Sequence, residues 1–263
     1  MRRKIRALAF ALGVLAPAAA VAAGPGGATE LVPHRALFVV KLAGPSAVIE
    51  SARGLAATEI RRTCDGWRYS QRYELEIVSA GGEESHTTFS LDARESLDGR
   101  VYSFHSTTDY GEGEPVTMIG RAEGGPAGGV VRYTEPARLT RDLPPGIGFA
   151  VGSVVQMLSA AAAGEDQFRM PWFVGSGPDE PLLISSLIFP AEAAKPSDAP
   201  LLQGRRWRFV SGFYADPKEA SPLYEGEETI AETGVMVEAL YRYDGYGLKL
   251  KLQRAEPVPL PHC

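Results

Sequence analysis

Alternation of apolar and polar residues with a period of two is the strongest constraint that this sequence places on its fold. In residues 246–253 every second residue is Tyr or Leu, and the residues between them are Gly, Lys, Lys and Gln. The same alternation occurs over 235–243 and 67–77. Because this period places successive side chains on opposite faces, each segment predicts a β-strand with one buried and one solvated face.

Tight turns separate the alternating segments. Asp244-Gly245 joins the last two of them, Gly81-Gly82 leads into 85–91, and Asp98-Gly99 leads into 100–108. Gly and Pro together supply 49 of the 263 residues, which argues against a helical bundle. The sequence therefore predicts a mainly β protein with about a dozen or more strands, arranged as an antiparallel meander that curls or closes to hide its edges.

A single segment, Phe149–Ala163, is predicted to be helical. Apolar residues recur at i, i+3, i+4 and i+7 from Val151, and Gly164 provides a stop. Pro144-Pro145-Gly146 precedes the segment. Such a helix would either plug or cap a barrel, or separate two halves of the sheet, with 175–179 and 190–200 as loops.

Residues 1–23 have the form of a secretory signal peptide. A positively charged start is followed by a short Ala-rich apolar stretch, and small residues allow cleavage after Ala22 or Ala23. The apolar stretch is too short for a stable membrane span, and no later hydrophobic run is long enough either. We therefore expect an exported protein in which 24–30 is a flexible N-terminus and 31–263 is a single domain.

Two cysteines remain after cleavage, Cys64 and Cys263. In an oxidising compartment an even count is most simply explained by one disulfide, which would close a loop of 199 residues. The alternatives are two free thiols or a metal-binding pair, although no Cys-x-x-Cys spacing is present.

The net charge makes a nucleic-acid-binding protein unexpected. The chain carries 27 basic and 32 acidic residues, for a formal charge of −5. Removal of 1–23, which holds four positive residues and no acidic ones, leaves −9. Nucleic-acid-binding proteins usually concentrate positive charge to displace counterions from phosphates.

Motifs for metals, cofactors and nucleophilic catalysis are missing from the sequence. It contains no His-Glu-x-x-His and no Gly-x-Ser-x-Gly. Glu83, Glu84 and His86 lie beside a Gly-Gly turn, where solvated polar residues are expected. Gly146-x-Gly148 lacks the parallel strand of a dinucleotide site. We therefore expect no metal and no cofactor.

Asp92, Glu95 and Asp98 form an acidic cluster that is expected around a turn. Paired carboxylates are defined in space, so this cluster is the one candidate for hydrolytic chemistry. Two carboxylates converging in a cleft would favour a hydrolase acting on envelope carbohydrate or lipid.

An ordered series of short motifs resembles the envelope-integrity protein B (EipB) family of Gram-negative bacteria. The resemblance covers about residues 31–263, and the order and spacing of the motifs carry it. The motifs are His34-Arg35-Ala36, Cys64-Asp65-Gly66-Trp67, Gln71-Arg72, Glu95-Ser96-Leu97-Asp98-Gly99, Trp207, Tyr214, Pro222-x-Tyr224-Glu225, Thr233-Gly234-Val235 and Pro261-His262-Cys263.

The resemblance implies a periplasmic protein of about 14 strands wound as a broken, spiral-like β-barrel with one central helix. It also implies one disulfide, matched here by Cys64 and Cys263. Members of the family maintain the cell envelope and are linked functionally to a periplasmic tetratricopeptide-repeat protein, with no catalysis established. The family often has a Phe-Pro-x-x-His pattern entering the helix, whereas this chain has Phe149-Ala150-Val151-Gly152-Ser153.

Two functions of different class follow. The first is a non-enzymatic envelope factor whose curved sheet binds a periplasmic protein, of the tetratricopeptide-repeat type, or a lipid-like ligand. The second is the hydrolase that would use Asp92, Glu95 or Asp98. The first is preferred, and the sequence assigns no residues to its binding surface.

Overall fold

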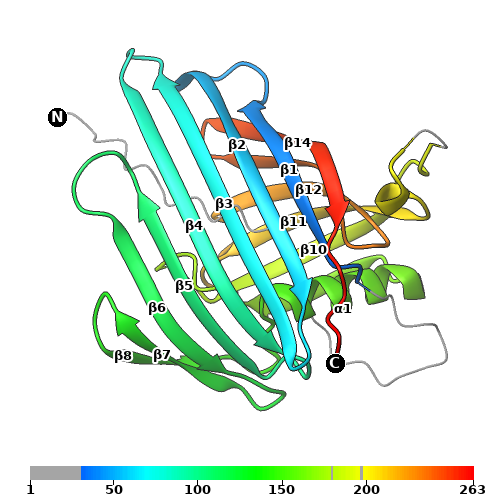
Figure 1. The fold of residues 1–263 in the computed structure, drawn as a ribbon. Coiled ribbons are helices and arrows are strands. Elements are labelled where there is room, and N and C mark those ends of the chain that lie inside the picture. Colours follow the sequence, from blue (N-terminus) through cyan, green and yellow to red (C-terminus); the bar gives the residue numbers. More distant parts are fainter. Residues whose placement is uncertain (1–30, 179, 196–197) are drawn as a thin grey trace.

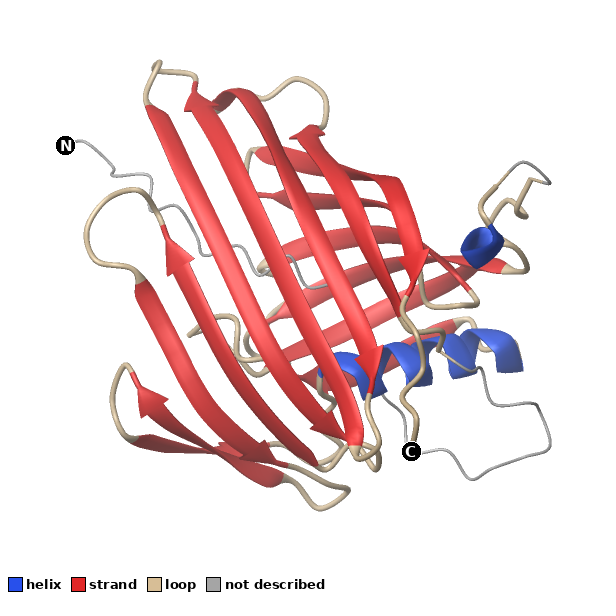
Figure 2. Ribbon diagram, in the orientation of Figure 1, coloured by secondary structure: helices blue, strands red, loops and turns tan. Residues whose placement is uncertain are grey.

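The computed structural model describes residues 31–178, 180–195 and 198–263. The expected signal peptide and the expected flexible segment 24–30 lie outside these residues. The described residues form one sheet, one α-helix, α1 (Ala150–Ala163), and a short 3-10 helix, η1 (Pro200–Leu202) (Figure 2). No helix in this part of the chain is both long and apolar enough to cross a membrane.

The sheet has 14 strands, and all of its pairings are antiparallel. The strands are β1 (His34–Leu42), β2 (Ile49–Arg62), β3 (Gly66–Ser79), β4 (Glu84–Ser96), β5 (Val101–Asp109), β6 (Val116–Glu123), β7 (Gly129–Glu135), β8 (Leu139–Leu143), β9 (Gln167–Trp172), β10 (Leu182–Pro190), β11 (Arg206–Tyr214), β12 (Tyr224–Ala231), β13 (Met236–Tyr243) and β14 (Tyr246–Pro257).

Strand order confirms the predicted meander. From one edge to the other the order is β8 through β1 and then β14 through β9, so the first and last strands pair at the centre of the sheet. His34 lies opposite Pro257 at one end of this pairing, and Leu42 lies opposite Leu248 at the other. β8 and β9 remain as edges, so the sheet curls without closing into a barrel.

The curl brings the two halves of the sheet face to face. In Figure 1 the strands β10–β12 cross behind β2–β4, and α1 lies across one end. Buried side chains of both halves, such as Tyr69 on β3 and Ile230 on β12, belong to one continuous hydrophobic core, although four strands separate β3 from β12 in the sheet. The inner faces of the two halves therefore share one interior.

Helix α1 begins one residue after the predicted start, because Phe149 is its N-cap, and it ends at Gly164 as predicted. Gly164 has a φ of 85°, the left-handed conformation that glycine adopts readily at a helix C-terminus. Residues such as Val151, Val154 and Leu158 are buried against the sheet. The helix lies between β8 and β9 in sequence and caps the open end of the sheet (Figure 1).

Aromatic side chains fill the interior beside the start of α1. The Tyr102 and Phe149 rings stack with centroids 5.0 Å apart, and Phe173 meets the edges of both. Phe104 and Tyr133 extend this cluster towards β7. Edge-to-face and offset stacking of this kind adds to the free energy gained from burying the rings.

The predicted turns are confirmed, but the predicted strand 85–91 is too short. Gly82, Gly99 and Gly245 all have positive φ values, as tight turns require. β4 continues to Ser96, so Glu95 lies in a strand and not in a turn. The prediction stopped early because charged residues occupy both faces of the strand end and hide the alternation.

Candidate functional site

The two cysteines form the expected disulfide. Cys64 lies in the turn between β2 and β3, and its α-carbon is 5.7 Å from that of Cys263. Both residues are exposed at the surface. Upstream in the C-terminal tail, the buried Val258 donates a hydrogen bond from its backbone N–H to the carbonyl oxygen of Pro33. The tail is therefore held to the first strands of the chain at two points.

The three predicted acidic residues do not share a cleft. Asp92 faces outward from β4, where its Oδ2 lies 2.5 Å from Nη2 of Arg72. Asp98 lies in the exposed turn after β4 and accepts a hydrogen bond from Ser96 Oγ at 2.6 Å. Glu95 is buried on the opposite face of the sheet from Asp92. The pair of carboxylates that would favour hydrolysis is not assembled from these residues.

Glu95 instead joins the sheet to the helix. Its carboxylate accepts hydrogen bonds from the backbone N–H groups of Val151, at 2.6 Å, and Gly152, at 2.8 Å. These are groups that the first turn of a helix leaves unpaired, and the helix dipole favours a negative group there. Burial nevertheless raises the pKa of Glu95 to about 7, against the opposing effect of the two N–H groups.

The Phe149–Ser153 segment, where the family often carries a histidine, forms the start of α1. Ser153 Oγ donates back to the carbonyl oxygen of Phe149 within this first turn. The residue that meets the segment from the sheet is Glu95, and none of residues 149–153 is ionisable.

Two further buried carboxylates were missed by the sequence analysis. Glu180 accepts hydrogen bonds from the backbone N–H groups of Val174, Gly175 and Ser176 at 2.6–3.0 Å, and burial raises its pKa. Glu228 accepts a hydrogen bond from the Tyr241 hydroxyl, and burial raises its pKa to about 8. Glu228 occupies an inward position of an alternating strand, which is the one signal that could have identified it.

The histidines among the described residues do not gather into a metal-binding cluster. His34 is buried, its Nδ1 lies 2.7 Å from the Val32 carbonyl oxygen, and loss of hydration lowers its pKa. His86 pairs with Glu74 on the outer face at 2.9 Å. In the described part of the chain, no three His, Cys, Asp or Glu side chains lie close enough together to hold a metal ion.

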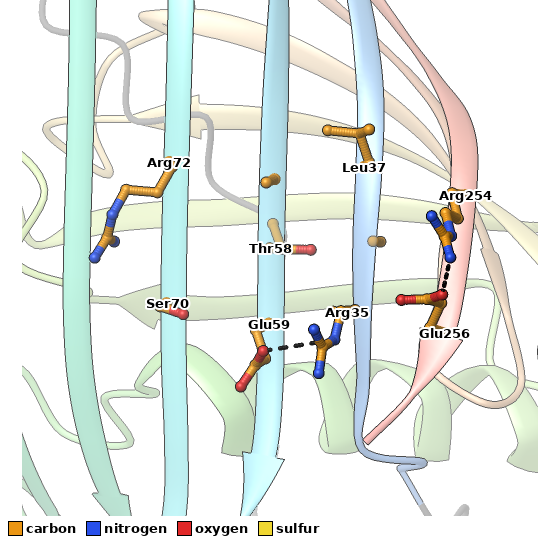
Figure 3. A pocket seen from close by; sticks show the side chains of 10 residues that line it. Arg35, Leu37, Thr58, Glu59, Ser70, Arg72, Arg254 and Glu256 are labelled. Atoms are coloured by element: carbon orange, nitrogen blue, oxygen red, sulfur yellow. Dashed lines mark hydrogen bonds and ion pairs between the residues drawn. The ribbon is translucent and has the colours of Figure 1, made fainter.

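The outer face of the sheet carries a hollow of about 350 Å³ over β14, β1, β2 and β3. Leu37 and Ala57, which are directly opposite each other on β1 and β2, contribute apolar surface to it. Figure 3 shows charged side chains around this surface, with Arg72 on the β3 side and Arg254 and Glu256 on the β14 side. The volume lies at the lower end of the range for ligand pockets.

Hydrogen bonding around the hollow leaves Arg35 poorly paired. Arg61 donates to Glu59 from both Nε, at 2.9 Å, and Nη2, at 2.6 Å. Arg35 Nε lies 3.8 Å from the other oxygen of Glu59, which is beyond hydrogen-bond distance (Figure 3). Among the described residues, none accepts a hydrogen bond from the Arg35 guanidinium, so its donors remain available to an anion.

Together these features define an open, barrel-like β protein that is held by one disulfide and has a hollow on its outer face. The chain belongs to the EipB-like family, whose model matches residues 25–259. Its fold is similar to that of a crystal structure of a beta-barrel-like protein of domain of unknown function DUF1849 from Brucella abortus. That likeness has a TM-score of 0.79 and 20% identity, over 88% of this chain and 99% of the other. None of the curated proteins matches the chain.

Proposed function

We propose that this EipB-like protein is a non-enzymatic factor of the periplasm that maintains the cell envelope by binding. Its ligand is either a periplasmic protein of the tetratricopeptide-repeat type or a lipid-like envelope molecule. The signal-peptide pattern and the exposed disulfide support an exported protein.

The hollow on the outer face is the observation that carries this proposal. It combines apolar surface from Leu37 and Ala57 with the poorly paired guanidinium of Arg35. A site that offers both apolar area and unpaired hydrogen-bond donors suits an amphipathic ligand. The apolar part of the ligand can pack on the apolar area, and its polar part can accept hydrogen bonds from the donors. The hollow also lies where the first and last strands meet, so it exists only in the complete fold.

The variant Ala57→Trp tests this assignment, because a large side chain at this outward position would fill the hollow. Ser103→Trp, on the outer face of β5, provides a matched control two strands away from β3. In cells that lack the native gene, Ser103→Trp should restore resistance to membrane-disrupting detergent, whereas Ala57→Trp should not. Circular dichroism of both purified variants establishes that they are folded. Full complementation by folded Ala57→Trp would contradict the assignment.

A further inference from the structure

The strand registers place a regular grid of side chains on the outer face around the hollow. β14, β1, β2 and β3 are neighbours, and their outward residues lie opposite one another in four rows. The four central positions form an apolar block that consists of Leu37, Val39, Leu55 and Ala57. Leu55 is 50% exposed and Leu37 is 38% exposed, so the block presents its apolar area to solvent.

Twelve positions surround this apolar block, and basic residues predominate among them. Seven are basic, four are acidic and one is Ser70, which gives a local charge of +3 on a chain whose formal charge is −5. The basic residues are Arg35, Lys41, Arg53, Arg72, Lys249, Lys251 and Arg254, and the acidic ones are Glu59, Glu74, Glu76 and Glu256.

Most of these charges are already paired. Arg53 lies 2.5 Å from Glu76, and Lys249 lies 3.0 Å from Glu238. Arg254 pairs with Glu256, and Arg72 pairs with Asp92 outside the grid. In each of these pairs the acidic group neutralises the basic one, so the four pairs leave no net positive site.

Lys41 and Lys251 are different, because neither forms an ion pair with any described residue. Lys251 lies directly opposite Val39, and Lys41 is two residues beyond Val39 on the same face of β1. Diagonal neighbours of this kind have α-carbons roughly 7–8 Å apart, so both ammonium groups can reach one anionic group. Both are exposed and adjoin the apolar block.

We propose that the outer face binds an anionic amphiphile, with its acidic headgroup on Lys41 and Lys251 and its hydrocarbon chain on the apolar block. The headgroup carries a phosphate or carboxylate, and the amphiphile is a lipid. This inference rests on the proposed function and names the chemical class of its ligand. Because the whole chain is acidic, attraction to an anionic lipid must come from the local grid and not from the net charge.

Vesicle flotation tests the proposal with two probes, phosphatidylglycerol vesicles and phosphatidylcholine vesicles, at low salt. The wild-type protein should bind the first and not the second, and binding should weaken as salt screens the lysines. The double variant K41Q/K251Q should lose roughly 10- to 30-fold in affinity, since each Lys near an anionic surface contributes separately. The double variant E238Q/K249Q removes an ion pair of the same surface without changing the net charge, so it is the control and should bind almost as wild type does.

Removing apolar area from the block gives a second measurement that leaves charge unchanged. Leu55→Ser, at an exposed position, should weaken vesicle binding several-fold without unfolding the protein. The inference is overturned if wild type does not bind phosphatidylglycerol vesicles, or if K41Q/K251Q binds them as tightly as E238Q/K249Q. Equal binding of the wild type to both kinds of vesicle would also contradict the proposal that the headgroup of the ligand is acidic.

These outcomes separate this inference from the proposed function. If vesicle binding fails but Ala57→Trp still abolishes detergent resistance, the hollow binds another kind of ligand and the envelope role stands. In that case the ligand of the hollow is a protein partner. If vesicle binding behaves as expected but Ala57→Trp complements fully, the amphiphile site is present, and the hollow is not what maintains the envelope.

Discussion

Glu95 and Gly152 are packed so closely that a β-carbon at position 152 would lie 2.6 Å from Oε1 of Glu95. The same oxygen accepts the hydrogen bond from the Gly152 N–H. The absence of a side chain at this position of the first helical turn therefore allows a carboxylate from β4 to reach the helix N-terminus.

Gly152→Ala should destabilise the protein by about 1–2 kcal/mol, although alanine is the better helix former by about 1 kcal/mol. The added methyl group would displace Glu95 and leave buried N–H groups unpaired. Urea unfolding of the variant and the wild type measures the difference.

A double-mutant cycle provides the control for Gly152→Ala. Once Glu95 is replaced by Ala, the β-carbon has no carboxylate to displace, and Gly152→Ala should become neutral or stabilising by up to about 1 kcal/mol. A stabilising effect of Gly152→Ala in the wild-type background would contradict the close packing of this pair.

Glu228→Gln should reduce the loss of stability that alkaline pH causes. Burial raises the pKa of Glu228 to about 8, so the folded state keeps a proton that the unfolded state releases above its ordinary value near 4.5. Stability from this group is therefore full below about pH 4.5 and falls as the pH rises towards 8. The free energy of unfolding of Glu228→Gln, relative to wild type, should rise by roughly 2–4 kcal/mol between pH 5 and pH 8.

The comparison between variant and wild type is needed because other buried groups titrate in the same range. Glu95 contributes a slope of the same sign up to about pH 7. His34 contributes the opposite slope, because its lowered pKa makes the folded state resist a proton that the unfolded state accepts below about 6.5. If the free energy of unfolding of Glu228→Gln varies with pH in parallel with that of the wild type, the pKa of Glu228 is not raised in the folded protein.

Reduction of the Cys64–Cys263 bond should lower the melting temperature of the wild-type protein. A loop of 199 residues corresponds to roughly 5 kcal/mol in the chain-entropy model, and this is an upper figure. Both cysteines are exposed, so dithiothreitol should reach the bond in the folded protein. The double variant C64S/C263S should melt at the temperature of the reduced wild type and show no response to dithiothreitol. An identical melt of oxidised and reduced wild type would contradict this contribution.

The meander and its turns could be predicted because they depend on local patterns. Alternation over 235–243 and 246–253 and the Asp244-Gly245 turn identify the last hairpin without any knowledge of tertiary contacts. The number of strands and the broken barrel came from the family resemblance and not from these patterns. The pairing of β1 with β14 joins residues more than two hundred positions apart, and no local signal encodes it.

Most of the hollow and of the proposed amphiphile site beside it could not be predicted, because both depend on which strands become neighbours. Lys41, Lys251 and Leu55 are unremarkable as separate surface residues, and only the registers of β14, β1 and β2 bring them together. Glu95 was identified as acidic but assigned to a turn, because charged residues on both faces of the β4 end hide the alternation. Its helical partners lie 56 and 57 residues away in sequence, so no local pattern indicates them. Buried carboxylates of this kind are found from tertiary contacts and not from spacing.

Photo-crosslinking in living cells tests the central claim, that the outer face over β14, β1, β2 and β3 is where this protein meets its envelope ligand. A photoreactive amino acid is placed at position 57, and the same amino acid at position 103 serves as the control. We predict that illumination gives a discrete adduct from position 57 and none from position 103. No adduct from position 57, or the same adduct from both positions, would contradict the claim.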